Sequence, residues 1–518
     1  MKTEIKDYRK KVLGCWLGKA VGGVLGAPFE AYPGMNDVSY YDPIPNQMLP
    51  NDDLELQVMY ACALQNMDAP RLNRNILGDI WLKHMEYNAD EYAVAICNLR
   101  NGIRPPYSGS YDNYFCDGMG AAIRSELWAC LAPGDPNLAA KYAFEDGSVD
   151  HAENGIYAEV FLAAMESQAF VESDVTRLIK TGLSYLPENS TLHKSITDTC
   201  IWWQESRDWK NVRSRIFNTY ASEFASCVLP NIAFTVLALL AGEGDFGKSI
   251  CIATNCGMDT DCTAATAGAI LGLINPEAVG EKWLKPIGRD LVVRESKIVN
   301  LKTPETLDAF TDLVIALKNR LGEFTSLPPE PEPDWSEHKI HAEVCALKNL
   351  HWWHIPLLGF NGKWEPVELP GLLTTLDLKR FEGTLQLLLK LKFKIDEDDE
   401  YSIMFNTPAS CQVYLDPDWN KDGALSDNED MLFGRSRPFF GQEPGRFQSK
   451  QSMCNTIFSP CLGGAPLNQI KRNLRLKPGI HELLVSIVPQ ADDKNIRWGM
   501  GIGKMSTTGF LPKAFRWK

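Results

Sequence analysis

The sequence has no excess of positive charge: 52 lysines and arginines stand against 66 aspartates and glutamates, for a formal net charge of -14. Proteins that bind nucleic acid in general carry a basic surface for the phosphate backbone. No internal repeat and no low-complexity tail stand out either. We therefore expect small molecules or metal ions as partners, not nucleic acid, and the sequence leaves the oligomeric state open.

The sequence also lacks a disulfide framework, because its 14 cysteines are scattered without the paired spacing of such a framework or of a zinc site. This favours a reducing compartment, and we expect the cytoplasm. Only Val12–Phe29 is apolar enough to suggest a signal sequence or a membrane span, but Lys19 and the glycines of this stretch interrupt it. Val12–Cys15 resembles a lipobox only faintly. We expect neither a membrane segment nor a lipid anchor.

Two or more domains are expected, because 518 residues exceed what one hydrophobic core usually holds. From Tyr8 to about Leu321, apolar residues recur at a spacing of three to four, which is typical of helices. Ser326–Pro333 is a proline-rich acidic stretch of the kind that separates domains. We predict an all-α domain over residues 1–325 and a linker over residues 326–334. The clearest helical segments are Leu54–Leu64, Asn154–Ala169 and Ile232–Ala241.

The remaining residues, 335–518, consist of short apolar and β-branched runs broken by Gly, Pro, Asn and Asp. They predict an all-β domain, a jelly-roll-like sandwich. Trp352, Trp353 and Trp364 could form a platform for sugar rings, although tryptophans in a β domain more often lie in the core. The runs are Leu373–Leu378, Leu385–Ile395, Tyr401–Phe405, Cys411–Leu415 and Glu482–Val488.

One segment of this β domain, Asp418–Glu429, matches the twelve-residue EF-hand calcium loop, with Gly423 at the sixth position. A strand-like run precedes it and no clear helix follows, unlike in a true EF-hand. Two interpretations stay open: a bound Ca²⁺ that fixes the loop, and an acidic turn held by Asx hydrogen bonds. The ligand positions would be Asp418, Asn420, Asp422, Ala424, Ser426 and Glu429.

A second pattern, Gly242–Ser249, matches the P-loop. A P-loop offers bare backbone N–H groups to phosphate after a strand, whereas this segment carries Glu243 and Asp245 and follows Pro230–Ala241, which is helix-like. We predict a turn between two helices here instead of a phosphate site.

The first acidic feature of the helical part follows a glycine pattern. Glycines at positions 14, 18, 22 and 26 recur every fourth residue, which places them on one helix face and lets another backbone approach closely. Pro28 ends this helix and leaves Glu30 at a chain bend. Taken alone, Glu30 would be a solvated surface acid.

Two further acidic segments each open a helix. Asn51 looks like a capping residue, and Asp52 and Asp53 follow it. Asp259 and Asp261 precede a run of very small residues that can lie deep among other helices. Adjacent acids repel each other and an unpaired buried carboxylate is costly, so a cation beside them would explain both segments.

Oxygen donors without a cluster of His or Cys thiolates favour Mg²⁺, Mn²⁺ or Ca²⁺ over Zn²⁺. Five carboxylates suffice for two ions. The residues alone leave two interpretations open, a shared metal site and independent helix caps, because the sequence does not show that the segments meet.

In their order along the chain, these segments resemble the motifs of the ADP-ribosylglycohydrolase family: Gly26–Glu30, then Asn51–Asp53, then Asp259–Asp261 before a small-residue helix. The resemblance covers roughly residues 8–320. It implies an all-α domain that holds two Mg²⁺ ions between these motifs, where the ions bind the substrate ribose and help to position water for cleavage at C1″.

The resemblance also implies roles for individual residues. Glu30, Asp52 and Asp53 would be catalytic, with Glu30 either a metal ligand or the acid/base. Gly118 and Gly120 resemble the glycine-rich substrate loop of the family, whose backbone N–H groups are free to approach phosphate. The metal ligands would be Glu30, Asn51, Asp52, Asp53, Asp259, Asp261, Cys262 and Thr263.

One further residue, His151, falls where the family has a histidine that faces the substrate. A surface or core histidine with satisfied hydrogen bonds is the alternative interpretation, and the sequence leaves both open.

Two positions depart from the family pattern. Asn51 stands where the family commonly has Thr or Ser, and Cys262 stands where it commonly has a second Thr ligand. An amide oxygen still binds a hard ion, whereas a neutral thiol binds Mg²⁺ poorly. One ion would therefore be weaker, absent or held differently, for example by Thr263.

Together the motifs predict a divalent-metal-dependent hydrolase of a glycosidic bond that releases ADP-ribose or a ribosyl group. One alternative is a glycoside hydrolase for carbohydrates or nucleosides whose β domain binds sugar. The other is a non-catalytic family member that acts as a binding protein. The sequence does not decide between N- and O-glycosidic cleavage.

Overall fold

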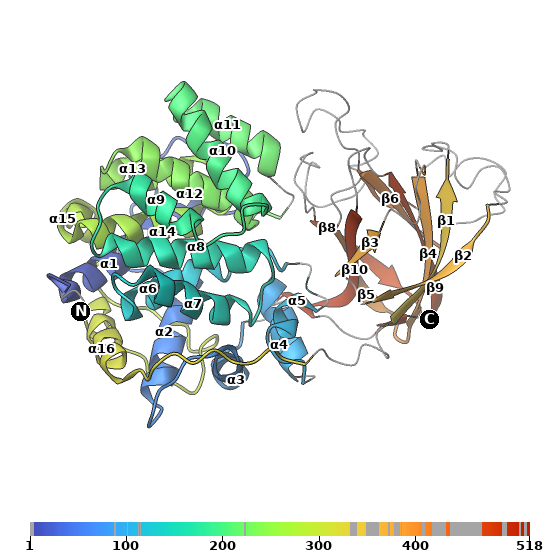
Figure 1. Ribbon diagram of the computed structural model, residues 1–518, viewed down its shortest axis with the longest axis horizontal. Helices are drawn as coiled ribbons and strands as arrows, with labels where there is room; N and C mark the ends of the chain where they lie inside the picture. Colours follow the sequence, from blue (N-terminus) through green and yellow to red (C-terminus); the bar gives the residue numbers. More distant parts are fainter. Residues whose placement is uncertain are drawn as a thin grey trace.

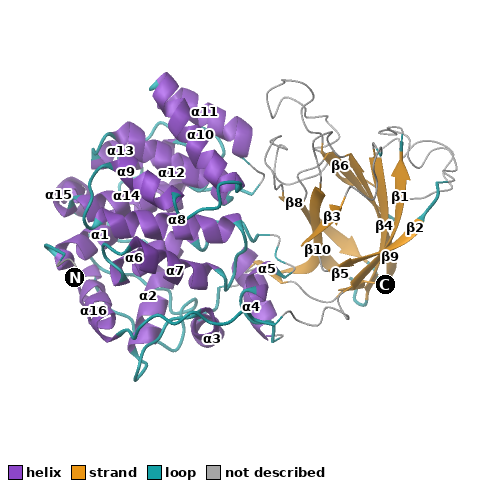
Figure 2. Cartoon of the chain, in the orientation of Figure 1, coloured by secondary structure: helices purple, strands orange, loops and turns teal. Residues whose placement is uncertain are grey.

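In the computed structural model, helices occupy the N-terminal part of the chain and strands the C-terminal part (Figures 1 and 2). The last helix ends at Arg320 and the first strand begins at Lys339. The predicted helical N-terminal part is confirmed, and the C-terminal part is antiparallel β structure. The structure describes residues 5–87, 90–100, 102–111, 113, 115–221, 224–331, 339–348, 362–370, 373–377, 384, 386–406, 410–416, 431–435, 469–488, 495–506, 509–511 and 515–517.

The three segments with the clearest helical spacing all lie in helices, which are α2, α8 and α12. The helical elements are α1 (Tyr8–Gly26), η1 (Ala27–Phe29), α2 (Asp52–Gln65), α3 (Arg74–His84), α4 (Asp90–Arg100), α5 (Tyr107–Ser110), η2 (Ala122–Arg124), α6 (Ser125–Leu131), α7 (Pro136–Gly147), α8 (Asn154–Ala169), α9 (Val175–Leu183), α10 (Thr191–Ser206), α11 (Trp209–Tyr220), α12 (Val228–Gly242), α13 (Phe246–Asn255), α14 (Thr260–Ile274), η3 (Pro276–Val279), α15 (Gly280–Leu284) and α16 (Leu307–Arg320).

Helix α1 packs along its length against α14 through the predicted glycine face. A Cβ atom at Gly18 would lie 2.0 Å from the carbonyl oxygen of Gly268, and one at Gly22 would lie 2.1 Å from that of Ala264. Gly14 and Gly26 face α14 in the same way. This close approach brings the end of α1, where Glu30 follows, to the acidic start of α14.

The same helix explains the apolar run near the N-terminus. Tyr8–Phe29 is the one stretch among the described helices that is long and apolar enough to cross a membrane by length and composition. In this structure 78% of its apolar window is buried among the other helices. The run therefore forms a core helix of the helical part.

The P-loop-like segment is a turn between α12 and α13, as predicted. Glu243 and Gly244 have positive φ angles of 55° and 85°, which reverse the chain after α12. Asp245 then accepts the N–H of Lys248 and caps α13. A helix, not a strand, precedes the segment.

Among the described strands, all pairs are antiparallel and form two sheets, of seven and five strands. The first sheet has the order β2-β1-β4-β9-β6-β7 with β12 beside β4, and the second has the order β11-β10-β5-β8 with β3 beside β10. The five predicted β runs lie in β3, β4, β5, β6 and β9. The strands are β1 (Lys339–Leu347), β2 (Glu365–Pro370), β3 (Leu373–Asp377), β4 (Gln386–Ile395), β5 (Asp399–Asn406), β6 (Ser410–Leu415), β7 (Met431–Arg435), β8 (Gln469–Leu476), β9 (Gly479–Val488), β10 (Asn495–Ser506), β11 (Gly509–Leu511) and β12 (Phe515–Trp517).

The first sheet is centred on the pairing of β4 with β9, where Leu389 lies opposite Val485. The second half of β4 alternates buried and exposed residues, as expected for a strand with one covered face. Trp364 packs against a small core that includes Leu388, and Lys390 Nζ lies 4.0 Å from its ring centroid. Trp352, Trp353 and the candidate calcium loop Asp418–Glu429 lie outside the described residues.

Candidate metal centre

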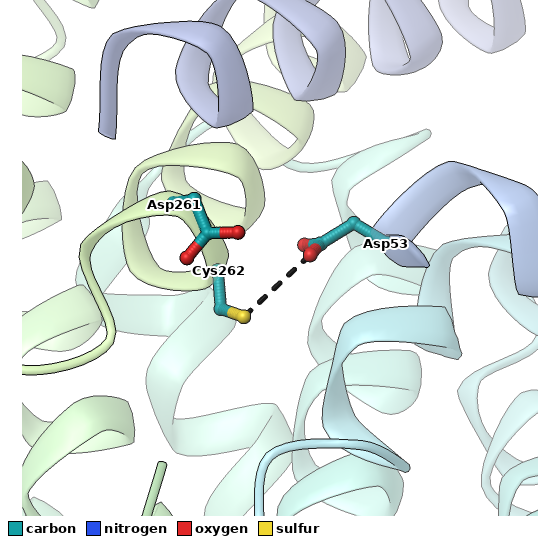
Figure 3. Close-up of side chains that lie close together, drawn as sticks. All are labelled: Asp53, Asp261 and Cys262. Atoms are coloured by element: carbon teal, nitrogen blue, oxygen red, sulfur yellow. Dashed lines mark hydrogen bonds between the residues drawn. The ribbon is translucent and has the colours of Figure 1, made fainter. Parts of the chain in front are cut away.

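The three acidic segments meet at the start of α14. Oxygen or sulfur atoms of Asp53, Asp261 and Cys262 lie within 4.8 Å of one another, and Figure 3 shows Asp53 on α2 facing the other two residues. Glu30, Asp259 and Asp261 form a second group with the same spacing. Asp261 belongs to both groups. The structure therefore favours a shared acidic centre over independent helix caps.

Local hydrogen bonds hold the segments in place. Asn51 caps α2 by accepting the N–H of Asp53 at 2.8 Å. The loop after Glu30 is tied to the loop before Asp259, because the N–H of Met258 donates to the carbonyl of Tyr32 at 2.7 Å. The acids thus come together through backbone contacts of their own segments.

Three of these carboxylates, those of Asp53, Asp259 and Asp261, each have a buried Oδ1 atom without a hydrogen-bond partner. Asp259 is 2% exposed and Asp261 is 6% exposed, and each has a buried Oδ1 atom with no hydrogen-bond partner. Burial, opposed by a hydrogen bond from Cys262, raises the pKa of Asp259 to about 7. Burial and then the charge of Asp259 raise the pKa of Asp261 well above its ordinary value. Bare carboxylate oxygens held this close fit a divalent cation such as Mg²⁺.

Lys19 is a member of the centre that the sequence analysis missed. Its ammonium lies 3.2 Å from Asp53 Oδ1 and 2.8 Å from Glu126 Oε1, and all three side chains are buried. Gln57 donates to the other oxygen of Glu126 at 3.0 Å. The sequence signal was available, because a lone charge inside an apolar helix requires a buried partner.

Asp52 lies at the edge of the centre and belongs to neither group of three. Burial and then the charge of Asp53 raise the pKa of Asp52 to about 8, and Arg294 acts in the opposite direction. Arg294 is fixed beside it by a pair with the buried Glu55, at 2.7 Å from Nη2 to Oε2, and by Tyr87. The structure therefore places Asp52, which was predicted to be a catalytic residue and a metal ligand, beside the two acidic groups but in neither of them.

The remaining predicted ligands are engaged with the protein itself. Asn51 Oδ1 is the atom that caps α2. The Cys262 thiol donates to Asp53 Oδ2 at 3.5 Å, and burial raises the pKa of this thiol well above its ordinary value, so it is neutral. Thr263 Oγ1 donates to the carbonyl of Thr260 at 3.2 Å. Their side chains stabilise the acidic segments in this structure.

The backbone N–H groups of the predicted substrate loop, Gly118 and Gly120, are not free as we expected. The N–H of Gly118 donates to Phe115 O at 2.8 Å, and the N–H of Gly120 donates to Glu91 Oε1 at 3.2 Å. The two N–H groups that we expected to be free for phosphate are therefore both engaged. A Cβ at Gly120 would lie 2.4 Å from Glu91 Oε1, so the glycine makes room for that carboxylate.

His151 lies behind this loop and is completely buried. Its Nδ1 atom is 3.0 Å from Asp150 Oδ1, and its Nε2 atom is 3.6 Å from Glu91 Oε1. Burial lowers its pKa, but Asp150 and then Glu91 outweigh burial and raise the pKa to about 9. The structure thus places His151 as a core histidine between two carboxylates, not facing the acidic centre directly.

Without a cation, we expect the protein to lose stability as the pH rises from about 4 to about 8. Asp259 and Asp52 have raised folded-state pKa values of about 7 and about 8, whereas their ordinary value is 3.8. Between these values the folded state binds more protons than the unfolded state, so the free energy of unfolding falls with rising pH. Below about pH 4 both states are protonated and this penalty is absent.

Thermal unfolding in EDTA between pH 5 and pH 8.5 would measure this effect. Saturating Mg²⁺ should flatten the dependence, because the cation neutralises the carboxylates. A melting temperature in EDTA that stays constant or rises over this range would contradict the expectation.

These features define a helical N-terminal part with a buried acidic centre suited to a divalent cation. A family model described as ADP-ribosylglycohydrolase matches residues 4–314, and the chain belongs to this family. The family resemblance seen in the acidic motifs is confirmed. The family acts on ADP-ribose glycosidic bonds, so membership supports a glycohydrolase-type activity.

Solved structures give weaker likenesses. An ADP-ribosylglycohydrolase-related protein complex matches with 19% identity and a TM-score of 0.40, over 61% of this chain and 99% of that one. A β-glucosidase from Kluyveromyces marxianus, in complex with glucose and in a Se-Met-labelled form, matches with 13% identity and TM-scores of 0.19 and 0.20. These two matches cover 33% of this chain and 16% of that one. No curated protein matches the chain.

Proposed function

We propose that this chain is a divalent-metal-dependent glycohydrolase that cleaves the glycosidic bond of an ADP-ribosyl or related ribosyl substrate. One observation carries the proposal: Asp259 and Asp261 each keep a bare, buried Oδ1 atom beside Glu30. A fold that holds three carboxylates together without a basic partner gains stability when a cation enters. Family membership supplies the reaction class.

Glu30, Asp259 and Asp261 would hold the ion, which we propose to be Mg²⁺, with Mn²⁺ as a substitute. When bound, such an ion supplies positive charge that stabilises negative charge developing on oxygen. Asp259 and Asp261 would act only as ligands of the ion, because both side chains are buried.

Glu30 would also handle a proton, because it is the exposed member of the centre. Partial burial and then the charge of Asp53 raise the pKa of Glu30 above its ordinary value, which makes Glu30 a stronger base than an ordinary carboxylate. Glu30 would accept a proton from the water that attacks the anomeric carbon. Asp52, beside Arg294, would lie next to this group.

The test is hydrolysis of a small panel with Mg²⁺ and again with EDTA. The panel contains ADP-ribosyl-arginine, ADP-ribosyl-serine, a nucleoside and simple glycosides. We expect release from an ADP-ribosyl substrate that EDTA abolishes and added Mg²⁺ restores, because the carboxylates alone repel each other. Turnover that EDTA leaves unchanged would refute the metal dependence. Turnover of the simple glycosides alone would refute the ADP-ribosyl substrate class.

For the C-terminal part, we propose that the two antiparallel sheets pack as a jelly-roll-like sandwich over residues 335–518, after a linker over residues 326–334. The antiparallel pairing and the one-sided burial pattern of β4 support this proposal. We propose Ca²⁺ as the ion of Asp418–Glu429, on the sequence pattern alone.

A further inference from the structure

Asp53 differs from the other acids of the centre because a lysine forms an ion pair with it. Oδ1 is paired with the ammonium of Lys19 at 3.2 Å, and Oδ2 accepts the thiol hydrogen of Cys262 at 3.5 Å. Asp53 is completely buried, so water does not compete for these contacts. The negative charge of Asp53 is therefore compensated by a protein cation without a metal ion, although its Oδ1 atom accepts no hydrogen bond.

Among the described residues, Glu30, Asp259 and Asp261 have no such cationic partner, although Cys262 and Asp261 form hydrogen bonds with Asp259. Within the described part of the chain, no Lys, Arg or His side chain forms an ion pair with any of them. Asp259 and Asp261, like Asp53, each have a buried Oδ1 atom without a hydrogen-bond partner, but no ion pair compensates their charge. The centre thus divides into one carboxylate that is neutralised by a lysine and three that are not.

Lys19 is fixed in this position. It lies in the middle of α1, beside Gly18, whose backbone contacts α14 closely. Its ammonium also pairs with the buried Glu126 at 2.8 Å, so moving it away would leave two buried carboxylates uncompensated. An ion that approached Asp53 would meet a fixed positive charge and a neutral thiol, which is a poor ligand for Mg²⁺.

We infer that the centre takes a single divalent cation, held by Glu30, Asp259 and Asp261, and that the Lys19 ammonium permanently occupies the place beside Asp53 that a second cation would need. This inference rests on the proposed metal dependence and adds the stoichiometry and the residue that sets it. One divalent ion also matches the three unpaired carboxylates better than two ions would.

The test is the number of Mn²⁺ ions bound per full-length chain, measured by equilibrium dialysis with metal analysis and by electron paramagnetic resonance. We expect one ion per chain and the six-line spectrum of isolated Mn²⁺. Two ions per chain with a coupled spectrum would overturn the inference and leave the proposed function intact. No bound ion would overturn both, so the two failures are distinguishable.

Matched variants test whether Lys19 is the residue that limits the centre to one ion. The pair Lys19→Met with Glu126→Gln removes one positive and one negative charge and leaves Asp53 free, so we expect two ions per chain. Glu126→Gln alone is the control and should bind one. Cys262→Thr should also bind one, because Lys19 remains.

A double variant that folds but still binds one ion would refute the role of Lys19, and so would a Cys262→Thr variant that binds two. Folding is followed by circular dichroism. If the double variant does not fold, the wild type and Cys262→Thr still decide the question.

Discussion

Asp261→Asn is expected to abolish the response of the protein to Mg²⁺. Asp261 belongs to both acidic groups, so no other single carboxylate has as many neighbours in the centre. The variant should lose at least about 100-fold in kcat/KM, since even the partners of metal ligands cost 10- to 100-fold when removed. The rise in melting temperature on adding Mg²⁺ should disappear as well.

In EDTA the same variant should be more stable than the wild type. The amide removes a buried carboxylate that has an unpartnered oxygen, and the gain should be on the order of 1 kcal/mol or more. The gain should grow with pH, because burial raises the pKa of Asp261 and the wild type is penalised most when this group is ionised. Chemical denaturation at pH 6 and pH 8.5 would measure it.

Glu30→Gln is the comparison for Asp261→Asn. It should lower kcat by about 10²- to 10⁴-fold if Glu30 transfers a proton, yet change the stability in EDTA by less than about 0.5 kcal/mol, since the side chain is exposed. An Asp261→Asn variant that keeps both Mg²⁺-dependent turnover and Mg²⁺-induced stabilisation would show that the cation binds elsewhere.

Gly22→Val should destabilise the helical part by about 3 kcal/mol or more, at the upper end for an overpacked core. A Cβ at this position would lie 2.1 Å from Ala264 O and 2.3 Å from Ala264 C. These are backbone atoms, so relief requires separating α1 from α14. Since Asp261 lies in the first turn of α14, the remaining folded protein should also bind Mg²⁺ more weakly.

The matched control is Gly78→Ala in α3. Its Cβ would meet only side-chain atoms, the nearest being Leu99 Cδ2 at 3.2 Å. We expect a change within about 1 kcal/mol, because alanine favours the helix by a similar amount. The midpoint of urea unfolding measures both variants. Equal midpoints for Gly22→Val and Gly78→Ala would contradict the close packing of α1 on α14.

Much of the fold could be predicted because it depends on local spacing. The four-residue glycine period requires only helical geometry, and the small residues after Asp261 predict a buried helix in the same way. The partner of the glycine face could not be predicted. The hydroxyl of Thr260 at the start of α14 donates to Gly26 O, and the two residues are 234 positions apart in the sequence. Nothing in either segment indicates that the other segment is its partner.

In the acidic centre too, local features could be predicted from the sequence and long-range partners could not. Each acidic segment could be recognised from neighbouring residues. Lys19 could be recognised as a charge that needs a buried partner, but its partner Glu126 could not, because Glu126 lies 107 residues away along the chain. His151 was placed by motif position alone. Its neighbour Asp150 was visible in the sequence, whereas Glu91, which separates it from Gly120, was not. The sequence motifs therefore identify the acidic residues, whereas the residues that pair with them are known only from the packing of distant segments.

The pairing of α1 with α14 also affects how the chain is made. Translation adds about 5–20 residues per second, so the 234 residues between Gly26 and Thr260 require roughly 10–50 s. During that time the long apolar helix α1 is made before the surface of α14 that will cover its glycine face. Synthesis therefore includes a period in which the apolar surface of α1 lacks its native partner, and the cost of burying the charge of Lys19 opposes the insertion of this helix into a membrane during that period.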